Sequence, residues 1–180
     1  EVPDQVITAC AALELIQACA LVHDDIVDAS DTRRGHPTVH RSIESVHLEQ
    51  GWTGDAGRYG VSQAILVGDL ALTWADEMFV RSGVEPAALT RALGPWYEMK
   101  TEVLSGQMLD ILAEASGATD ETTPASDETA PPEDLGKIRV GLVCGGMTPV
   151  DAHVLVSRYV DQRPWLESVP VAQGVLAAAL

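Results

Sequence analysis

The chain has 180 residues and a formal net charge of −16, from 27 acidic side chains against 11 lysines and arginines. This charge argues against nucleic acid or an anionic membrane surface as a partner, although a metal ion can still mediate contact with an anionic small molecule. Hydrophobic residues make up 46% of the chain and aromatic residues only 4%, which favours helices over β-sandwiches. The three cysteines lack metal-ligand spacing and are typical of a reduced, cytoplasmic protein.

A first helix is predicted over residues 5–28. Pro3-Asp4 is a helix-start signal, and no glycine or proline follows before residue 29. The apolar residues cover nearly the whole circumference, which is typical of a helix inside a bundle. Glu14 and two polar residues interrupt the apolar run. We therefore expect a buried helix and no stable membrane insertion.

Further helices are predicted over residues 39–48, about 59–80 and about 86–117. Gly94-Pro95 is the position at which the last of them would break or kink. Helices with short connections favour an all-α fold, here a partial helical bundle over residues 1–117.

The composition changes after this predicted bundle. Residues 118–136 are rich in Thr, Ser, Pro, Asp and Glu, and they are predicted to form an acidic disordered linker. Residues 137–180 begin with a strand-like run that ends in paired glycines. This short irregular tail receives no functional assignment.

Three carboxylates, Asp24, Asp25 and Asp28, close the first helix, and Asp31 follows. Asp24 and Asp28 are four residues apart, so their side chains lie on one helix face about 6 Å apart. Asp31 would continue that stripe, while Asp25 lies about 100° around the helix. Carboxylates at this spacing repel each other unless a cation lies between them. Mg²⁺ suits the arrangement, because it takes oxygen ligands and often combines one or two carboxylates with substrate phosphates.

An arginine pair, Arg33 and Arg34, follows one loop after these carboxylates. A planar guanidinium binds two phosphate oxygens at once, so the pair is suited to a phosphate-bearing ligand. A helix end with solvated acids, followed by a turn, is the competing interpretation. The acids and arginines meet at the end of an unusually apolar helix, which favours a binding site.

Two other polar positions stand out. Asp69 follows Gly68 inside an apolar stretch, where a buried carboxylate needs a hydrogen-bond partner, an arginine or a metal-bound water. A buried acid that caps another helix is the alternative. Gln107 and Asp110 are three residues apart on one helix face, just after Gly106. Taken alone, such a pair is more often structural than functional.

Together, these stretches resemble the trans-isoprenyl diphosphate synthases, or polyprenyl synthetases, a family that includes geranylgeranyl diphosphate synthase. The stretch "VGDLAL" looks like the G-D-x-x-L helix of that family, and "EVLSGQMLDI" looks like its G-Q-x-x-D segment. The family's first aspartate-rich motif, D-D-x-x-D followed by R-R-G, is matched by Asp24, Asp25, Asp28, Arg33, Arg34 and Gly35.

The resemblance implies an isoprenoid-synthase helical bundle with a central cavity, in which Asp24 and Asp28 hold Mg²⁺. The metal would bind the diphosphate of an allylic substrate. Loss of that diphosphate gives an allylic carbocation, which isopentenyl diphosphate attacks before a proton is lost. Asp25 and the two arginines complete the implied catalytic set.

The same resemblance assigns roles to neighbouring side chains. Arg33 would hold the allylic diphosphate, and Arg34 would hold that of isopentenyl diphosphate. Gln107 and Asp110 would line the cavity near the metals. Family members pair into dimers, so a homodimer or a heterodimer is expected.

Product length is a further expectation from the resemblance. In this family, residues about one turn before the first aspartate form the floor of the product cavity. Aromatic side chains there stop chain growth early. Cys19 and Ala20 occupy these positions and are small. We therefore expect products of about twenty carbons or longer.

The chain also departs from the family pattern, and we expect a truncated polyprenyl synthetase. The N-terminal G-K-x-x-R element has no counterpart, and no adjacent pair of aspartates follows Asp110, where a second aspartate-rich motif is expected. A catalytically inactive accessory subunit of a prenyl synthase dimer is therefore one alternative. An HD-type metallophosphohydrolase is another, because His23-Asp24 is an H-D dyad with His36 and His40 nearby.

Overall fold

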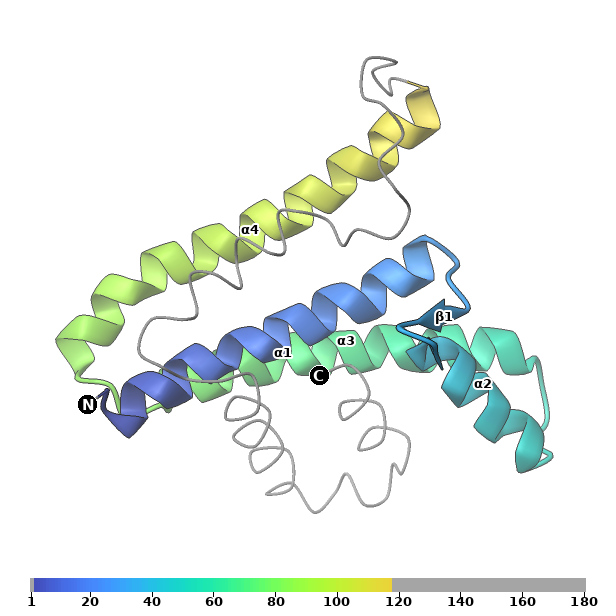
Figure 1. Cartoon of the computed structure of the whole chain (residues 1–180), viewed down its shortest axis with the longest axis horizontal. Coiled ribbons are helices and arrows are strands. Elements are labelled where there is room, and N and C mark those ends of the chain that lie inside the picture. The colour runs from blue at the N-terminus through green and yellow to red at the C-terminus, as the bar shows by residue number, and fades with distance from the viewer. Residues whose placement is uncertain (1, 118–180) are drawn as a thin grey trace. The chain divides into compact units, whose positions relative to one another are not determined.

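The computed structural model describes residues 2–117, which form helices and one short β-ribbon (Figure 1). The predicted all-α class is confirmed. The predicted linker, 118–136, and the tail, 137–180, with its strand-like run, lie outside the described residues. In chain order the elements are α1 (Asp4–Val27), β1 (Thr32–Arg33), β2 (His36–Pro37), α2 (Val39–Glu49), α3 (Ala56–Val80) and α4 (Pro86–Ser116).

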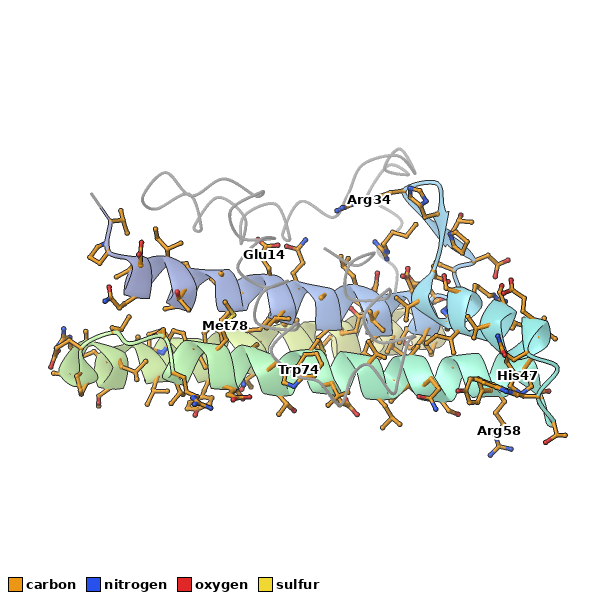
Figure 2. The ribbon with its side chains drawn as sticks, turned by 90° about the horizontal axis from the view of Figure 1, so that it is seen from below. Glu14, Arg34, His47, Arg58, Trp74 and Met78 are labelled. Atoms are coloured by element: carbon orange, nitrogen blue, oxygen red, sulfur yellow. The ribbon has the colours of Figure 1, made fainter. Side chains whose placement is uncertain are left out.

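The described residues belong to two compact units, one with α1–α3 and the other with α4. In the first unit α1 and α3 lie side by side (Figure 2). Short side chains let two helices approach closely, and larger buried side chains such as Leu15, Trp74 and Met78 complete the core. The buried alanines are Ala9, Ala11, Ala12 and Ala18 on α1, and Ala64, Ala71 and Ala75 on α3.

By length and composition alone, α1 could cross a membrane, since its most apolar 18-residue window has a mean hydropathy of 1.8. The core helix of a soluble protein meets the same criterion. In the structure, 44% of that window is buried, so α1 serves as a core helix of the first unit. That α1 does not insert stably into a membrane stays a prediction.

α1 ends at Val27 because the backbone soon leaves the helical conformation. Asp28 still has helical dihedral angles, but Ala29 has a φ of 51°. The chain therefore turns away before Asp31. The expectation that Asp31 continues the helical stripe of aspartates is wrong.

The loop after α1, where the sequence predicts only a helix break, forms an antiparallel β-ribbon. Thr32 pairs with Pro37, and Arg33 pairs with His36. The two turn residues, Arg34 and Gly35, have φ values of 52° and 81°. A two-residue hairpin turn of this kind requires positive φ at both positions, which glycine adopts readily. The turn thus holds Arg33 in an extended strand close to the end of α1.

α2 packs against the first half of α3. A Cβ on Gly60 would overlap the carbonyl oxygen of His40, so glycine permits this close crossing. α3 begins at Ala56, earlier than predicted, because the Asp55 carboxylate accepts a hydrogen bond of 2.7 Å from the backbone N–H of Arg58. Buried residues of α1, α2 and α3 form one apolar cluster: Val22, Val39, Ile43, Ala64 and Val67.

α4 is the described part of the second unit. Glu85 caps its start by accepting two backbone hydrogen bonds of 3.0 Å, and Pro86 lies in its first turn. α4 continues through Gly94-Pro95 as one helix of 31 residues, so the break considered there does not occur. It ends before Gly117, which has the left-handed conformation common at helix ends.

Candidate functional site

The aspartates at the end of α1 keep the geometry of a helical turn. The backbone N–H of Asp28 donates to the carbonyl oxygen of Asp24 at 2.8 Å, and Asp28 has φ and ψ of −81° and −1°. The two side chains therefore lie on one face of the helix. The Asp24 side chain is 31% exposed, and Asp28 is exposed. Both carboxylates can be reached from solvent.

The same face continues along α1 towards its N-terminus. Leu13, Gln17 and Ala20 precede Asp24 at steps of three and four residues, and all four are partly exposed. Ala11, Ala12 and Ala18, which are buried in the core, lie on other sides of the helix. α1 thus presents one solvent-accessible face that leads to the aspartates.

Arg33 reaches from β1 to two adjacent aspartates. Its Nε donates to Asp25 Oδ1 at 2.8 Å, and its Nη2 donates to Asp24 Oδ2 at 2.9 Å. The Asp25 side chain is only 5% exposed, whereas the Arg33 side chain is 34% exposed. Asp25 therefore anchors the guanidinium from the buried side, and Asp24 contacts it from the solvent side.

Burial shapes the protonation of this cluster. It raises the pKa of the Asp25 carboxyl, and the hydrogen bond and charge of Arg33 oppose that rise only in part. Burial also acts to lower the pKa of Arg33, but the hydrogen bonds and charges of Asp25 and Asp24 outweigh it and raise that pKa. The guanidinium stays charged and stabilises the buried carboxylate.

The last turn of α1 favours a bound cation. The C-terminal end of a helix carries partial negative charge, and this turn contains aspartates but no basic residue. Two exposed carboxylates suffice for Mg²⁺ when water and ligand phosphates fill the other positions. Within residues 2–117, no group of three or more His, Cys, Asp or Glu side chains is placed to hold a metal. The remaining positions around an ion bound here would be filled by water and ligand oxygens.

Arg34 directly follows Arg33 at the tip of the β-ribbon. It occupies the turn of the ribbon and is exposed. Figure 2 shows it on the side of α1 that faces away from α3, where Glu14 also lies. Arg33 therefore contacts the aspartates, while Arg34 is exposed on the turn of the ribbon.

The histidines do not gather around the aspartates. Nε2 of His23 lies 3.1 Å from the carbonyl oxygen of Ile65, and Nδ1 lies 3.8 Å from the sulfur of Cys19. His36 is exposed on β2, and His40 is buried in α2. This part of the chain gives no support to the metallophosphohydrolase alternative, because both nitrogens of the dyad histidine are already engaged.

Asp69 is not buried, contrary to expectation. Its side chain is 60% exposed, with Oδ1 3.8 Å from Nε2 of His23. The apolar neighbours suggested burial, but Asp69 lies on the outer face of α3 together with Ile65 and Leu66. A carboxylate in that position is solvated and needs no buried partner.

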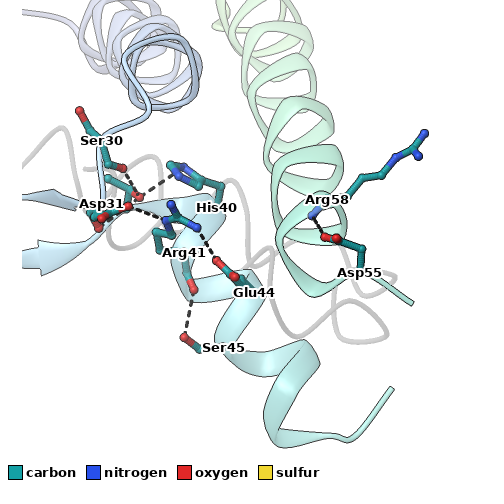
Figure 3. A network of polar contacts seen from close by, with 9 residues as sticks. Ser30, Asp31, His40, Arg41, Glu44, Ser45, Asp55 and Arg58 are labelled. Carbon is teal, nitrogen blue, oxygen red and sulfur yellow. Dashed lines mark hydrogen bonds and ion pairs between the residues drawn. The ribbon is translucent and has the colours of Figure 1, made fainter. Parts of the chain in front are cut away.

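A second arginine cluster joins the end of the α1 loop to α2 (Figure 3). Nε of Arg41 donates to Asp31 Oδ1 at 2.7 Å, and Nη1 donates to Glu44 Oε2 at 2.7 Å. Nearby, the Thr38 hydroxyl donates to the carbonyl oxygen of Ser30 at 2.9 Å. This cluster was not predicted, although the three-residue spacing of Arg41 and Glu44 indicated half of it.

Comparison with known proteins identifies the family of the chain. The polyprenyl synthetase family matches residues 1–128, which include the aspartates, the arginine ribbon and α4. The chain belongs to the polyprenyl synthetase family. The predicted resemblance is confirmed.

The chain is similar to several polyprenyl synthetases. It is 33% identical over 118 residues to geranylfarnesyl diphosphate synthase of Natronomonas pharaonis, and this match covers 66% of this chain and 29% of that protein. It is 35% identical over 106 residues to geranylgeranyl diphosphate synthase of Methanosarcina mazei, and this match covers 59% of this chain and 28% of that protein. The chain thus spans less than a third of the length of these two relatives.

A solved structure supports the fold. It is the geranylgeranyl pyrophosphate synthase from Corynebacterium glutamicum, complexed with isoprenyl diphosphate and magnesium. It is 37% identical to this chain, with a TM-score of 0.64, and the match covers 88% of this chain and 45% of that one. The fold is therefore that of a polyprenyl synthetase, over less than half the length of the solved chain.

The remaining residues singled out by the family motifs lie in both units. Cys19 is buried, whereas Ala20 lies one turn before Asp24 on the partly exposed face of α1. Gln107 and Asp110 are three residues apart on α4, in the second unit. Their position near the metal stays a prediction.

Proposed function

We propose that this chain carries the diphosphate-binding part of a Mg²⁺-dependent prenyltransferase. The reaction is the condensation of an allylic diphosphate with isopentenyl diphosphate to give a longer polyprenyl diphosphate. Membership of the polyprenyl synthetase family supports this class of reaction. The observation that carries the proposal is the shared face of Asp24 and Asp28, with the guanidinium of Arg33 2.9 Å from Asp24. Ligands for a cation and a donor for phosphate oxygens meet at one helix end.

Asp24 and Asp28 would hold Mg²⁺, which supplies positive charge to a departing diphosphate. Both carboxylates are on the surface, at a helix end without a basic residue in its last turn. Asp25 fits this task poorly, because it is buried against Arg33. Its contribution to the site is to position the guanidinium.

Arg33 would bind the allylic diphosphate, and Arg34 would bind that of isopentenyl diphosphate. Arg33 donates two of its five N–H groups to the aspartates, which leaves donors for phosphate oxygens. Arg34 adds a second positive charge on the exposed turn of the ribbon. The two side chains thus supply two positive charges, one for each of the two diphosphates.

The prenyl chain would lie along the face of α1 that precedes the aspartates. Leu13 and Ala20 supply apolar contact there, and an apolar wall keeps water from an allylic carbocation. Ala20 is small, which supports products of about twenty carbons or longer. Cys19 is buried beside this face and would support it from within.

Binding of inorganic pyrophosphate tests the site. Isothermal titration calorimetry is expected to show Mg²⁺-dependent binding that Asp24→Asn and Asp28→Asn each weaken about tenfold or more. Asp4→Asn, at the opposite end of α1, is the matched control and is expected to bind like the unsubstituted chain. Equal binding by all four proteins would contradict the proposed site.

Turnover is tested separately. The purified chain is supplied with Mg²⁺, an allylic diphosphate and labelled isopentenyl diphosphate, and the label is expected to enter a longer prenyl product. Arg33→Gln is expected to reduce this incorporation, because it removes the charge that faces the diphosphate. Incorporation that is insensitive to chelation of Mg²⁺ would contradict the mechanism.

A second candidate function is that of an accessory subunit without turnover of its own. The observation that favours it is the lack of an adjacent aspartate pair after Asp110 in this sequence. In this function the chain would pair with a full-length polyprenyl synthetase, in a heterodimer rather than a homodimer. This function predicts no turnover by the purified chain, but binding to a full-length polyprenyl synthetase and a change in that enzyme's turnover.

A further inference from the structure

We infer that His23 is a positioning residue, which sets the direction of Asp24 and Asp28 by holding the end of α1 against Gly68 of α3. The consequence for binding rests on the proposed function. The positioning of the helix end itself is argued only from the contacts of the His23 ring and does not need the proposed function. No prediction from the sequence included this contact, and a glycine in the middle of an apolar helix was its one visible sign.

The His23 ring lies directly on the backbone of Gly68. A Cβ on Gly68 would overlap Nε2 of the ring and would lie 2.6 Å from Cδ2 and 2.9 Å from Cε1. Packed side chains do not approach each other so closely. Any residue other than glycine would therefore displace the ring, which accounts for a residue that otherwise weakens a helix interior.

Hydrogen bonds hold the ring in this place. Nε2 lies 3.1 Å from the carbonyl oxygen of Ile65, which can only accept, so Nε2 carries the proton. In the neutral ring, Nδ1 is then the acceptor, and it lies 3.8 Å from the sulfur of Cys19, whose thiol donates to it. Asp69 Oδ1 lies 3.8 Å from Nε2 and attracts the same N–H group. Each ring nitrogen thus has a defined partner.

This contact sets the rotation of the last turns of α1 about the helix axis. Successive helical residues are about 100° apart, so fixing His23 on α3 also fixes the direction of Asp24, about 100° around the helix axis. Asp28 follows Asp24 on the same face. If the ring left Gly68, one constraint on this rotation would be lost, and both carboxylates are expected to change direction relative to Arg33. His23 thus acts through the helix and not on the ligand.

A set of alanine variants separates positioning from simple packing. Gly68→Ala is expected to displace the ring and to lower both the urea midpoint of unfolding and pyrophosphate binding. In the double variant His23→Ala/Gly68→Ala, the new methyl group enters the space left by the ring, so the urea midpoint is expected to recover. Gly94→Ala is the matched control, because a Cβ there meets no atom within 4 Å.

Mg²⁺-dependent binding of inorganic pyrophosphate is the deciding measurement. The positioning role predicts that the double variant binds about tenfold more weakly than the unsubstituted chain, although its urea midpoint has recovered. Recovered binding together with recovered stability would overturn the inference. His23→Gln, which keeps an N–H donor for Ile65, is expected to bind better than His23→Ala. Equal weakening by these two substitutions would also overturn it.

A second readout does not need the ligand. The side-chain carboxyl ¹³C resonances of Asp24 and Asp28 are expected to shift in His23→Ala and in the double variant, but not in Gly94→Ala. Unchanged resonances would overturn the inference, even where pyrophosphate binds normally. If the unsubstituted chain does not bind pyrophosphate, the proposed function fails, while shifted resonances still support the positioning role.

Discussion

Two arginines in the same unit each bridge two carboxylates, but only one of them reaches the interior. Arg33 donates to Asp25 at 2.8 Å, and Arg41 donates to Asp31 at 2.7 Å, so the two ion pairs have nearly equal lengths. The Asp25 side chain is 5% exposed, and the Asp31 side chain is 71% exposed. Burial therefore distinguishes these pairs, and distance does not.

The difference shows why one cluster can serve as a site and the other only as a surface link. At Asp25, the cost of removing a carboxylate from water stays with the folded protein unless Arg33 offsets it. At Arg41, hydrogen bonds to Glu44 and Asp31 raise the pKa of the guanidinium, but water and salt screen the charges. Both the stability of the folded protein and the proposed binding of a diphosphate therefore depend on Arg33.

The largest effect is expected from Arg33→Met. It leaves the buried carboxylate of Asp25 without its cation, and we expect a loss of about 2 kcal/mol in the free energy of unfolding near neutral pH. This figure lies below that of a fully buried pair, because about a third of the Arg33 side chain is exposed. Urea unfolding measures it.

The pH dependence is the control for this explanation. Without Arg33, burial raises the pKa of Asp25 further, so the carboxyl becomes protonated at a higher pH and no longer needs a cation. The loss caused by Arg33→Met should therefore be smaller at about pH 4 than at about pH 7. An equal loss at both values would mean that Arg33 contributes through packing alone.

Asp25→Asn tests whether burial or Arg33 decides the direction in which the pKa of the Asp25 carboxyl is shifted. Because the folded-state pKa of Asp25 is raised above its usual 3.8, the stabilising contribution of Asp25 is present below that pH and is lost as the pH rises through the folded pKa. The free energy of unfolding of the unsubstituted chain, minus that of Asp25→Asn, is expected to fall between about pH 3 and about pH 6. A rising difference would show that Arg33 outweighs burial.

His40, between the two arginine clusters, is expected to give a smaller effect of opposite sign. Burial and then the charge of Arg41 lower the pKa of His40 below its usual 6.5, against the opposing charges of Asp25, Asp31 and Glu44. Its stabilising contribution is present above that pH and is lost as the pH falls through the folded pKa. His40→Asn, which keeps an N–H donor, should lose less stability than the unsubstituted chain between about pH 7 and about pH 5, as measured by urea unfolding. Parallel losses would contradict this assignment.

The smallest effect is expected from Arg41→Gln. Its carboxylate partners are solvated after the substitution, so the free energy of unfolding should change less than in Arg33→Met. The remaining change should vanish near 1 M salt, where charges are screened within about 3 Å. Pyrophosphate binding should stay unchanged. A loss as large as that of Arg33→Met would remove the distinction between the two clusters.

Local spacing predicted part of the site and failed at identifiable places. The common face of Asp24 and Asp28 was predictable, because it follows from helical periodicity over four residues. Asp31 was placed wrongly, because the helix ends at a backbone turn that periodicity does not reveal. Asp69 was expected to be buried, but the packing of α1 and α2 decides which face of α3 is covered. The β-ribbon was missed, because Arg34-Gly35 is a weaker turn signal than the usual asparagine-glycine pair.

The sequence by itself determined the helices, the aspartate face and the membership of a family, because each depends on residues a few positions apart. Only the tertiary structure decided that Asp25 is buried while Asp24 stays accessible, and that Arg33 donates to both. The same holds for the contact of His23 with α3, since its hydrogen-bond partner Ile65 lies 42 residues away. Such contacts depend on how closely two helices pack and on their rotation about their axes, which local periodicity does not encode.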